Sequence, residues 1–198
     1  MVIKETYEWI HAWFDENLSN DLPRVLLVGD SITHGYQEKV RELMRGTAYV
    51  DYVSLSNAID QPFYKQVVSS VIESGNYALV HFNHGLHGIH MEKDVYRAEM
   101  EAFLSKLKMP VILVTSTSVR PSAGNAQKLQ MRVAERNDVV REIAAAQGWS
   151  VDDLYEVSIH MAEEKCLEDG VHYTQEGYAE FAKQVADCLT CKISKMLL

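Results

Sequence analysis

Short runs of almost wholly apolar residues alternate with longer amphipathic stretches over most of the chain. The apolar runs predict strands at 24–28, 49–55, 77–82, 111–115 and 149–151. Apolar residues at helical spacing predict helices between and after these runs, at 37–45, 62–73, 94–108, 126–147 and 175–194. Strands without a polar face are typical of a parallel sheet that helices cover on both sides. The alternation therefore predicts an α/β fold, a three-layer α/β/α sandwich around a five-stranded parallel sheet.

The beginning of the chain predicts one further helix. Four residues recur there at helical spacing: Tyr7, Ile10, His11 and Phe14. They favour a helix over 5–17. Neither a linker nor an internal repeat interrupts the pattern, and 198 residues, 47% of them hydrophobic, are enough to bury a substantial core. We therefore predict a single domain over residues 1–198.

The polar segments that follow the predicted strands contain the candidate chemistry. In an open parallel sheet, sites form at the carboxyl ends of the strands. This rule places Ser31 and the loops 54–60, 83–90 and 116–125 at one rim of the sheet. Candidate site residues are therefore expected in these segments.

Gly29-Asp30-Ser31 directly follows the first apolar run. This layout predicts a tight turn that presents the Ser31 hydroxyl at the start of a helix. Backbone N–H groups and the positive end of the helix dipole lie beside such a serine, and both suit a nucleophile whose attack creates an oxyanion. An ordinary turn with a helix cap uses the same residues, so the tripeptide alone leaves both interpretations open.

Asp169 and His172 stand three residues apart, just before the last helix, which Thr174 is expected to cap. In a turn, this spacing can bring the Asp169 carboxylate onto the Nδ1–H group of the imidazole. The carboxylate then fixes the tautomer, and Nε2 is left to accept a proton from a serine. A solvated histidine in a surface turn is the alternative.

Asn83 directly follows the third predicted strand, so its side chain is expected at the same rim as Ser31. Its amide group can donate to a developing oxyanion, a contact that lowers the activation barrier by about 3 kcal/mol. An asparagine turn ahead of Gly85 is the alternative.

Together these three motifs resemble the SGNH (GDSL-type) hydrolase family. They occur in the family's order over nearly the whole chain, and the most specific piece is Asp-Gly-Val-His-Tyr-Thr-x-Glu-Gly-Tyr, which begins at Asp169. The resemblance implies a flavodoxin-like fold and ester hydrolysis through an acyl-enzyme, with Ser31 as the nucleophile, His172 as the general base and Asp169 as its orienting partner. It also implies an oxyanion hole that includes the backbone N–H of Ser31 and the side chain of Asn83.

The chain departs from the family pattern in two places. The family usually has a glycine after its second strand whose N–H is a third oxyanion donor, whereas this chain has Asn57-Ala58. Ala58 is the expected donor and Asn57 the alternative, because any residue except proline carries a backbone N–H. The second departure is His81-Phe82-Asn83-His84 in place of Gly-x-Asn-Asp. The form Asn-x-Gly-Leu-His-Gly is similar to that of carbohydrate acetylesterases, which implies a small acyl ester such as an O-acetyl group on a sugar.

Four further residues are expected to border the substrate. Asp30 adjoins the nucleophile, where a structural part is favoured over a role as an acid in the reaction. His84 and His87 are expected to line the pocket. Arg120, after the fourth strand, can bind a carboxylate or a sugar hydroxyl; a solvated arginine, or one tied to an acidic residue, is the alternative.

A run of histidines offers a metal site as another alternative. Four of them recur every three residues: His81, His84, His87 and His90. Imidazole is a usual ligand for zinc and similar ions. Glycines within the run interrupt a helix that would present all four, and no carboxylate falls inside it. We therefore expect no metal and no organic cofactor.

Charge and composition limit the partners. A net charge of −9 disfavours nucleic acid and anionic membranes, and no apolar run approaches the roughly 18 residues that span a bilayer. A small-molecule ester, such as an acetylated sugar, is the expected partner. The three cysteines do not form a secreted disulfide pattern and no signal segment is evident, which favours a cytoplasmic protein. A processed secreted form is the alternative.

The sequence supports three functional hypotheses. A serine esterase leads, because binding alone has no need of the general base in the set Ser31, Asp169 and His172. A non-catalytic carbohydrate- or ligand-binding module on the same fold is the second. Metal-assisted hydrolysis through the histidine run is the third.

Overall fold

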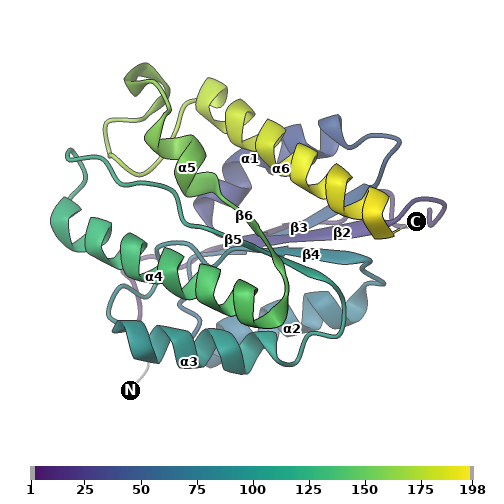
Figure 1. The fold of residues 1–198 in the computed structure, drawn as a ribbon, viewed down its shortest axis with the longest axis horizontal. Coiled ribbons are helices and arrows are strands. Elements are labelled where there is room, and N and C mark those ends of the chain that lie inside the picture. Colours follow the sequence, from purple (N-terminus) through teal and green to yellow (C-terminus); the bar gives the residue numbers. More distant parts are fainter. Residues whose placement is uncertain (1–2, 197–198) are drawn as a thin grey trace.

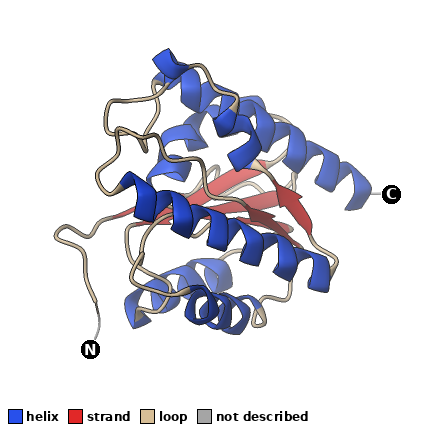
Figure 2. Ribbon diagram, turned by 60° about the vertical axis from the view of Figure 1, so that its left-hand side comes forward, coloured by secondary structure: helices blue, strands red, loops and turns tan. Residues whose placement is uncertain are grey.

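The computed structural model describes residues 3–196 and places a six-stranded sheet between two layers of helices (Figures 1 and 2). The strands are β1 (Ile10–Trp13), β2 (Arg24–Gly29), β3 (Tyr49–Leu55), β4 (Leu79–Phe82), β5 (Val111–Val114) and β6 (Ser150–Asp152). Their order is β1-β3-β2-β4-β5-β6. β2 to β6 run parallel, and β1 pairs antiparallel with β3 at the edge. The three-layer α/β/α sandwich and its five parallel strands are confirmed, and the sheet has one strand more than predicted.

The helices are α1 (Ser31–Leu43), α2 (Pro62–Ser74), α3 (Lys93–Leu104), α4 (Ala126–Gln147), α5 (Leu154–Ile159) and α6 (Gln175–Met196), with a 3₁₀ turn at Glu163–Lys165. α1, α5 and α6 cover one face of the sheet, and α2, α3 and α4 cover the other (Figure 1). Alternate residues of β2 enter the two resulting cores: Val25 and Leu27 pack on one side, Leu26 and Val28 on the other. Burial of both faces explains why the parallel strands are apolar throughout.

The first segment contains a strand, so the helix predicted over 5–17 is wrong. β1 aligns His11 with Ser54 of β3, and the Trp9 carbonyl accepts a hydrogen bond from the Ser56 N–H at 3.1 Å. All four β1 residues are exposed. An amphipathic helix derives its stability mainly from packing its apolar face, and this segment buries no such face. The edge of β3 instead offers backbone partners that make a strand the better state.

The strand order favours a crevice at the carboxyl ends of β2 and β4. These strands are neighbours, yet the helices that follow them, α1 and α3, cover opposite faces of the sheet (Figure 1). Connections that diverge in this way leave space at the carboxyl ends of the strands, where ligands bind in open α/β sheets. Ser31 and Asn83 come from these two strand ends.

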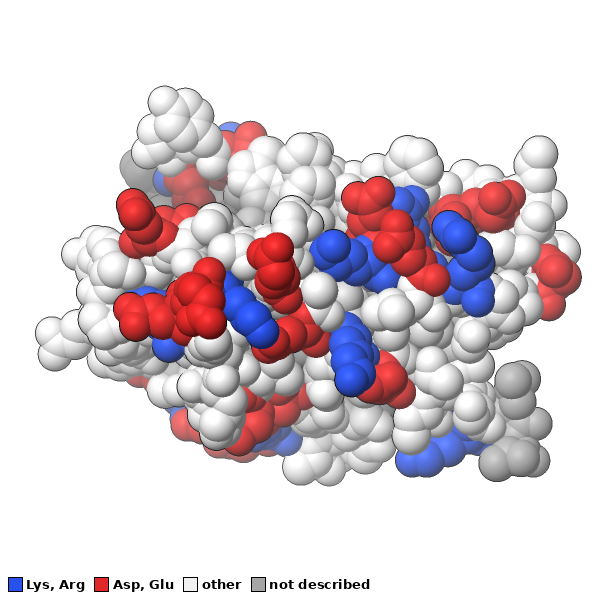
Figure 3. All heavy atoms as spheres, turned by 90° about the horizontal axis from the view of Figure 1, so that it is seen from above, with Lys and Arg blue, Asp and Glu red and all other residues white. Residues whose placement is uncertain are grey.

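On the face above α5 and α6, acidic and basic side chains lie next to one another (Figure 3). One such ion pair joins Lys165 to Glu180. The net charge of −9 is therefore not gathered into a single acidic area on this face. Within residues 3–196, no helix has the length and apolar character that crossing a membrane requires.

Candidate active site

Ser31 is the first residue of α1; it stands two positions after the end of β2 at Gly29 and directly after Asp30, the N-cap of α1. Asp30 Oδ1 accepts a hydrogen bond from the Ile32 N–H at 2.9 Å, which caps the helix. Only glycine fits at position 29, because a Cβ there would lie 1.9 Å from Thr33 Oγ1. The turn therefore presents the Ser31 hydroxyl at the positive end of the helix dipole, beside N–H groups that have no partner within the helix.

His172 connects Ser31 to Asp169. His172 Nε2 lies 2.8 Å from Ser31 Oγ, and His172 Nδ1 lies 2.7 Å from Asp169 Oδ2. Ser31 and His172 are 141 positions apart in sequence. The three side chains thus form a continuous hydrogen-bonded series, as the strand-end rule and the Asp-x-x-His spacing predicted.

Backbone contacts hold the Asp169 carboxylate in its ionised form. Asp169 Oδ1 accepts hydrogen bonds from the N–H groups of Val171 and His172, both at 2.9 Å. Burial raises the pKa of Asp169, but these two bonds and the His172 imidazole outweigh burial, so the pKa lies below its usual value. In a neutral imidazole, an ionised carboxylate on Nδ1–H favours the tautomer in which Nε2 faces the serine as an acceptor.

The turn that carries Asp169 and His172 is tied to the loop after β5. The Arg120 N–H donates to the Gly170 carbonyl at 2.8 Å. Gly170 has a φ of +75° and lies against Ser122 and Ala123, so a side chain at position 170 would be both strained and crowded. This packing sets the orientation of the Asp-x-x-His turn, and sequence spacing alone did not indicate it.

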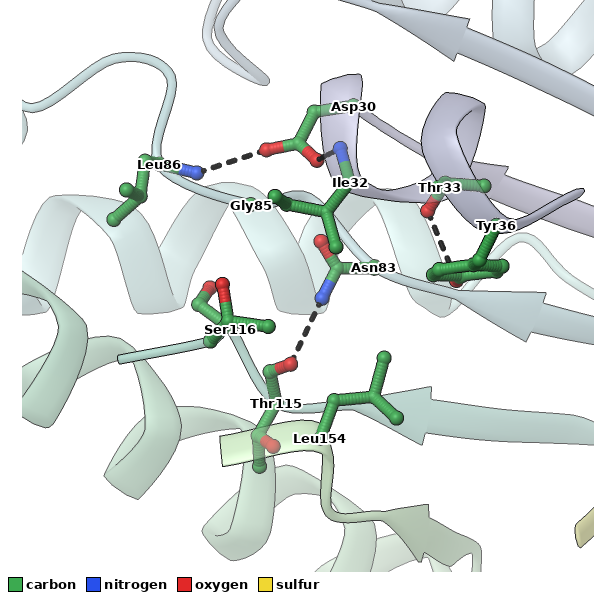
Figure 4. Close-up of a pocket in the computed structure, with 11 residues that line it drawn as sticks. Asp30, Ile32, Thr33, Tyr36, Asn83, Gly85, Leu86, Thr115, Ser116 and Leu154 are labelled. Carbon is green, nitrogen blue, oxygen red and sulfur yellow. Dashed lines mark hydrogen bonds between the residues drawn. The ribbon is translucent and has the colours of Figure 1, made fainter. Parts of the chain in front are cut away.

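Asn83 lies at the predicted rim, but its amide already has acceptors. Asn83 Nδ2 is 3.2 Å from the carbonyl oxygens of both Val114 and Thr115, and Figure 4 shows the amide nitrogen turned toward Thr115. The amide thus links the ends of β4 and β5. Its predicted donation to an oxyanion competes with these two bonds.

The loop after β3 is buried, and its side chains make internal contacts. The Asn57 amide donates to Gln61 Oε1 at 2.8 Å. Ala58 is only 3% exposed. It packs closely on Gly88, because a Cβ added at position 88 would lie 2.5 Å from the Cβ of Ala58. Donation of the Ala58 N–H to an oxyanion stays a prediction.

The residues expected to border the substrate have other partners in the structure. Asp30 is buried, and besides capping α1 it accepts the Leu86 N–H at 3.3 Å, consistent with its expected structural part. Arg120 donates to the carbonyls of Ser158, in the last turn of α5, and Met161, just beyond it, at 3.2 and 3.0 Å. This differs from the prediction of a substrate contact, because the guanidinium satisfies carbonyls that the helix end leaves unpaired.

The four histidines at 81–90 do not converge. His81 pairs with buried Asp152 at 2.9 Å, and His90 pairs with Asp60 at 2.7 Å. His87 lies 2.8 Å from Glu5. Among residues 3–196, no group of three or more His, Cys, Asp or Glu side chains is arranged to hold a metal ion.

His84 lies in the core instead of lining a substrate pocket. It is 3% exposed and packs between the rings of Tyr64 and Tyr96, with centroid distances of 5.3 and 5.7 Å. Burial, with a contribution from the charge of Arg136, holds the pKa of His84 well below its usual value. A neutral, buried imidazole at this position differs from the predicted pocket residue.

A polar pocket of about 660 Å³ opens beside Ser31 and His172. Its other lining residues are His34, Gly35, Gln37, Glu38, Lys39, Glu42, Gln175 and Tyr178. Most come from α1, where His34 and Gly35 stand three and four positions after Ser31 and so share its side of the helix. Helical spacing from the nucleophile was the signal that could have identified them. His34 further stacks on His11 of β1, with ring centroids 4.3 Å apart.

The architecture is that of a known class of folds. The chain has the fold of SGNH (GDSL-type) hydrolases. No protein-family model and no curated protein matches the chain.

Three solved structures illustrate the likeness. A lipase/acylhydrolase from Enterococcus faecalis aligns with 19% identity and a TM-score of 0.67, covering 86% of this chain and 96% of that one. A GDSL-like lipase from Bacteroides thetaiotaomicron aligns with 16% identity and a TM-score of 0.66, covering 87% and 88%. An acetylxylan esterase from Geobacillus stearothermophilus aligns with 17% identity and a TM-score of 0.66, covering 83% and 93%.

Proposed function

We propose that this protein is a serine esterase that hydrolyses a small acyl ester of a polar, hydroxyl-rich alcohol, such as an O-acetylated sugar. The observation that carries the proposal is the hydrogen-bonded series from Asp169 through His172 to Ser31, with contacts of 2.7 and 2.8 Å. A serine so placed can be deprotonated as it attacks a carbonyl carbon. The acylhydrolases and acetylxylan esterase with the same fold support this chemistry.

The proposed reaction has two halves. Ser31 Oγ attacks the acyl carbon while His172 Nε2 takes its proton, and Asp169 stabilises the imidazolium that forms. When the tetrahedral intermediate collapses, His172 returns the proton to the leaving alcohol. Water then attacks the acyl-serine by the same proton route and releases the carboxylic acid.

The oxyanion is proposed to lie at the start of α1. The Ser31 N–H belongs to the first turn, where backbone donors lack helical acceptors and the dipole favours negative charge. We assign the main donor role to this group. Asn83 contributes only when an amide hydrogen turns away from the carbonyls of Val114 and Thr115.

The space around the site supports a small acyl group and a larger polar alcohol. A cavity at the strand ends, bordered by Ile32, Asn83 and Leu86, holds only about 10 Å³, room for one water molecule (Figure 4). The pocket that Ser31 and His172 line measures about 660 Å³, and half of its lining residues carry charged or amide side chains. Such a lining suits hydroxyl groups and disfavours a long acyl chain.

Labelling of Ser31 tests the proposal directly. A fluorophosphonate probe with peptide mass mapping is expected to modify Ser31, and the wild-type protein is expected to hydrolyse 4-nitrophenyl acetate and acetylated sugars. Ser31→Ala should lose both, while EDTA should leave the activity unchanged. Absence of labelling and of turnover across short acyl esters would overturn the esterase; activity that survives Ser31→Ala but not EDTA would favour a metal-assisted hydrolase.

A further inference from the structure

Helix α4 presents two buried arginines to the loop that follows β4. Arg132 and Arg136 are four positions apart, so they lie on one side of the helix, and they are 4% and 1% exposed. A guanidinium loses strongly favourable hydration when it is buried, so it is stable there only with polar partners. Those partners are loop carbonyls: Arg136 donates to Gly85 at 2.9 Å and Gly88 at 2.8 Å, and Arg132 donates to Ile89 at 3.2 Å.

Arg136 and Arg132 differ in the partners of their guanidinium groups. Arg132 also pairs with Glu92 and Glu135. Arg136 has the ring of Tyr96 at 4.7 Å and the two glycine carbonyls. Both glycines have positive φ values, +75° and +71°, a conformation that turns the loop back on itself and that other residues adopt only under strain.

One peptide group connects Arg136 to the cap of the nucleophile helix. The Gly85 carbonyl accepts from Arg136 Nη1, and the N–H of the same peptide group, which belongs to Leu86, donates to Asp30 Oδ2 at 3.3 Å. The other carboxylate oxygen of Asp30 accepts the Ile32 N–H, next to Ser31. Figure 4 shows Leu86 and Ile32 on the two oxygens of Asp30. A cation at one end of a peptide group and a carboxylate at the other polarise it and strengthen both bonds.

The contact between the loop and Asp30 is close. A Cβ at position 85 would lie 1.7 Å from Asp30 Oδ2, so the loop backbone packs directly against the carboxylate. Asp30 in turn precedes the serine that His172 contacts. The loop thus has the buried side of α4 next to it on one side and the start of α1 on the other.

We propose that Arg136 is a positioning residue for Ser31, acting through the Gly85–Leu86 peptide group and Asp30. It does not touch the reacting atoms. It holds the loop so that Asp30 can cap α1 and fix the direction of the Ser31 hydroxyl and N–H. The inference rests on the proposed function for its catalytic consequence, but its structural content is independent of the reaction.

Enzyme kinetics test the catalytic consequence. Arg136→Met is expected to lower kcat by about 10- to 100-fold with KM changed less than about threefold, because a nucleophile misplaced by about 1 Å reacts slowly. Arg136→Lys keeps the charge but cannot reach both carbonyls, and its kcat should be intermediate. Arg141→Met is the matched control: Arg141 is on the same helix and pairs with Asp153 at the surface. A kcat for Arg136→Met within twofold of wild type would overturn the proposal.

A double-mutant cycle tests the route. If Arg136 acts through Asp30, the combined Arg136→Met and Asp30→Asn protein should lose little more activity than the worse single variant. Losses that multiply would show that the two residues act separately and would overturn the route. Should Arg136→Met fail to fold, Arg136→Lys replaces it in the cycle.

Amide hydrogen exchange separates this inference from the proposed function. In Arg136→Met the amides of Leu86 and Ile32, which both bond to Asp30, are expected to exchange at least about tenfold faster, with no change in Arg141→Met. Unchanged exchange would contradict the positioning role. This result holds even for a protein that hydrolyses no ester, in which case only the proposed function fails.

Discussion

His172 and the four histidines at 81–90 lie in different chemical environments. His172 lies at the surface with one nitrogen on a carboxylate and the other on a serine hydroxyl. The histidines at 81–90 each have a separate environment: a buried carboxylate for His81, two tyrosine rings for His84, and surface acids for His87 and His90. The difference teaches that an imidazole becomes a candidate base when its second nitrogen faces a group that needs deprotonation, and regular spacing along the chain does not provide this.

Replacement of His172 is expected to have the largest effect on this comparison. His172→Gln removes the base and should lower kcat by at least about 10³-fold, because the serine hydroxyl then has no proton acceptor. His90→Gln is the matched variant in the other group and should stay within about twofold of wild type. Steady-state hydrolysis of 4-nitrophenyl acetate measures both. Equal losses in the two variants would remove the distinction between the groups.

Replacement of Asp169 tests why His172 differs from the others. Asp169→Asn keeps the shape but can stabilise the wrong imidazole tautomer, so kcat should fall by about 10²- to 10⁴-fold with little change in KM. Melting temperatures of the variant and wild type serve as the folding control, since Asp169 is partly exposed. A loss below threefold would mean that His172 needs no orienting partner.

His84 should make the folded protein sensitive to acid. Because burial lowers its folded-state pKa, the unfolded chain binds a proton first, below an ordinary histidine pKa of about 6.5. The contribution of neutral His84 to the free energy of unfolding is therefore fully present above that pH. It falls by up to about 1.4 kcal/mol for each pH unit below it. His84→Phe should flatten this dependence, and exposed His160→Gln should not. Urea unfolding between pH 7.5 and 5.5 measures the slopes; parallel slopes for wild type and His84→Phe would contradict the assignment.

His87 should show a smaller dependence of opposite sign. Burial lowers the pKa of His87, but the hydrogen bond to Glu5 and the charges of Asp30 and Glu5 outweigh it, so the pKa is raised. The stabilisation is thus present below about pH 6.5 and is lost as pH rises through the folded-state value. Because Glu5 is 45% exposed, Glu5→Gln should cost only about 0.5 kcal/mol at pH 6 and nothing at pH 8.5.

The same unfolding measurements check the Glu5–His87 pair, with Glu73→Gln as the surface control. A cost that grows with pH would exclude a protonated His87 as the partner of Glu5.

Much of the fold followed from local pattern. The apolar runs located all five parallel strands, and the predicted bounds of β3 and α4 agree with the structure residue for residue. Edge strand β1 was missed because its four residues are exposed and so have no burial pattern. Short helix α5, which Asp153 caps, was missed because six residues are too few to establish a helical period.

The candidate site was predictable to a similar extent. Ser31 and the Asp169–His172 pair could be located because a strand end and a short turn are local features, and the strand-end rule brings them to one rim. The partners of Arg120, His84 and Asn83 could not be predicted from the sequence. Several alternative acceptors or neighbours become available to them only when distant loops meet.

The sequence by itself determined the layer architecture, the position of the serine after β2 and the identity of the residues that form its hydrogen-bonded series. Apolar periodicity and turn chemistry act over a few residues, so they can be recognised without coordinates. Only the tertiary structure decided that His172 faces Ser31 across 141 positions, that the histidines at 81–90 lie in separate environments, and that Arg136 contacts the loop that packs on the cap of α1. These are pairings between distant segments, and their free energy depends on burial and on which partner is nearest once the chain has folded.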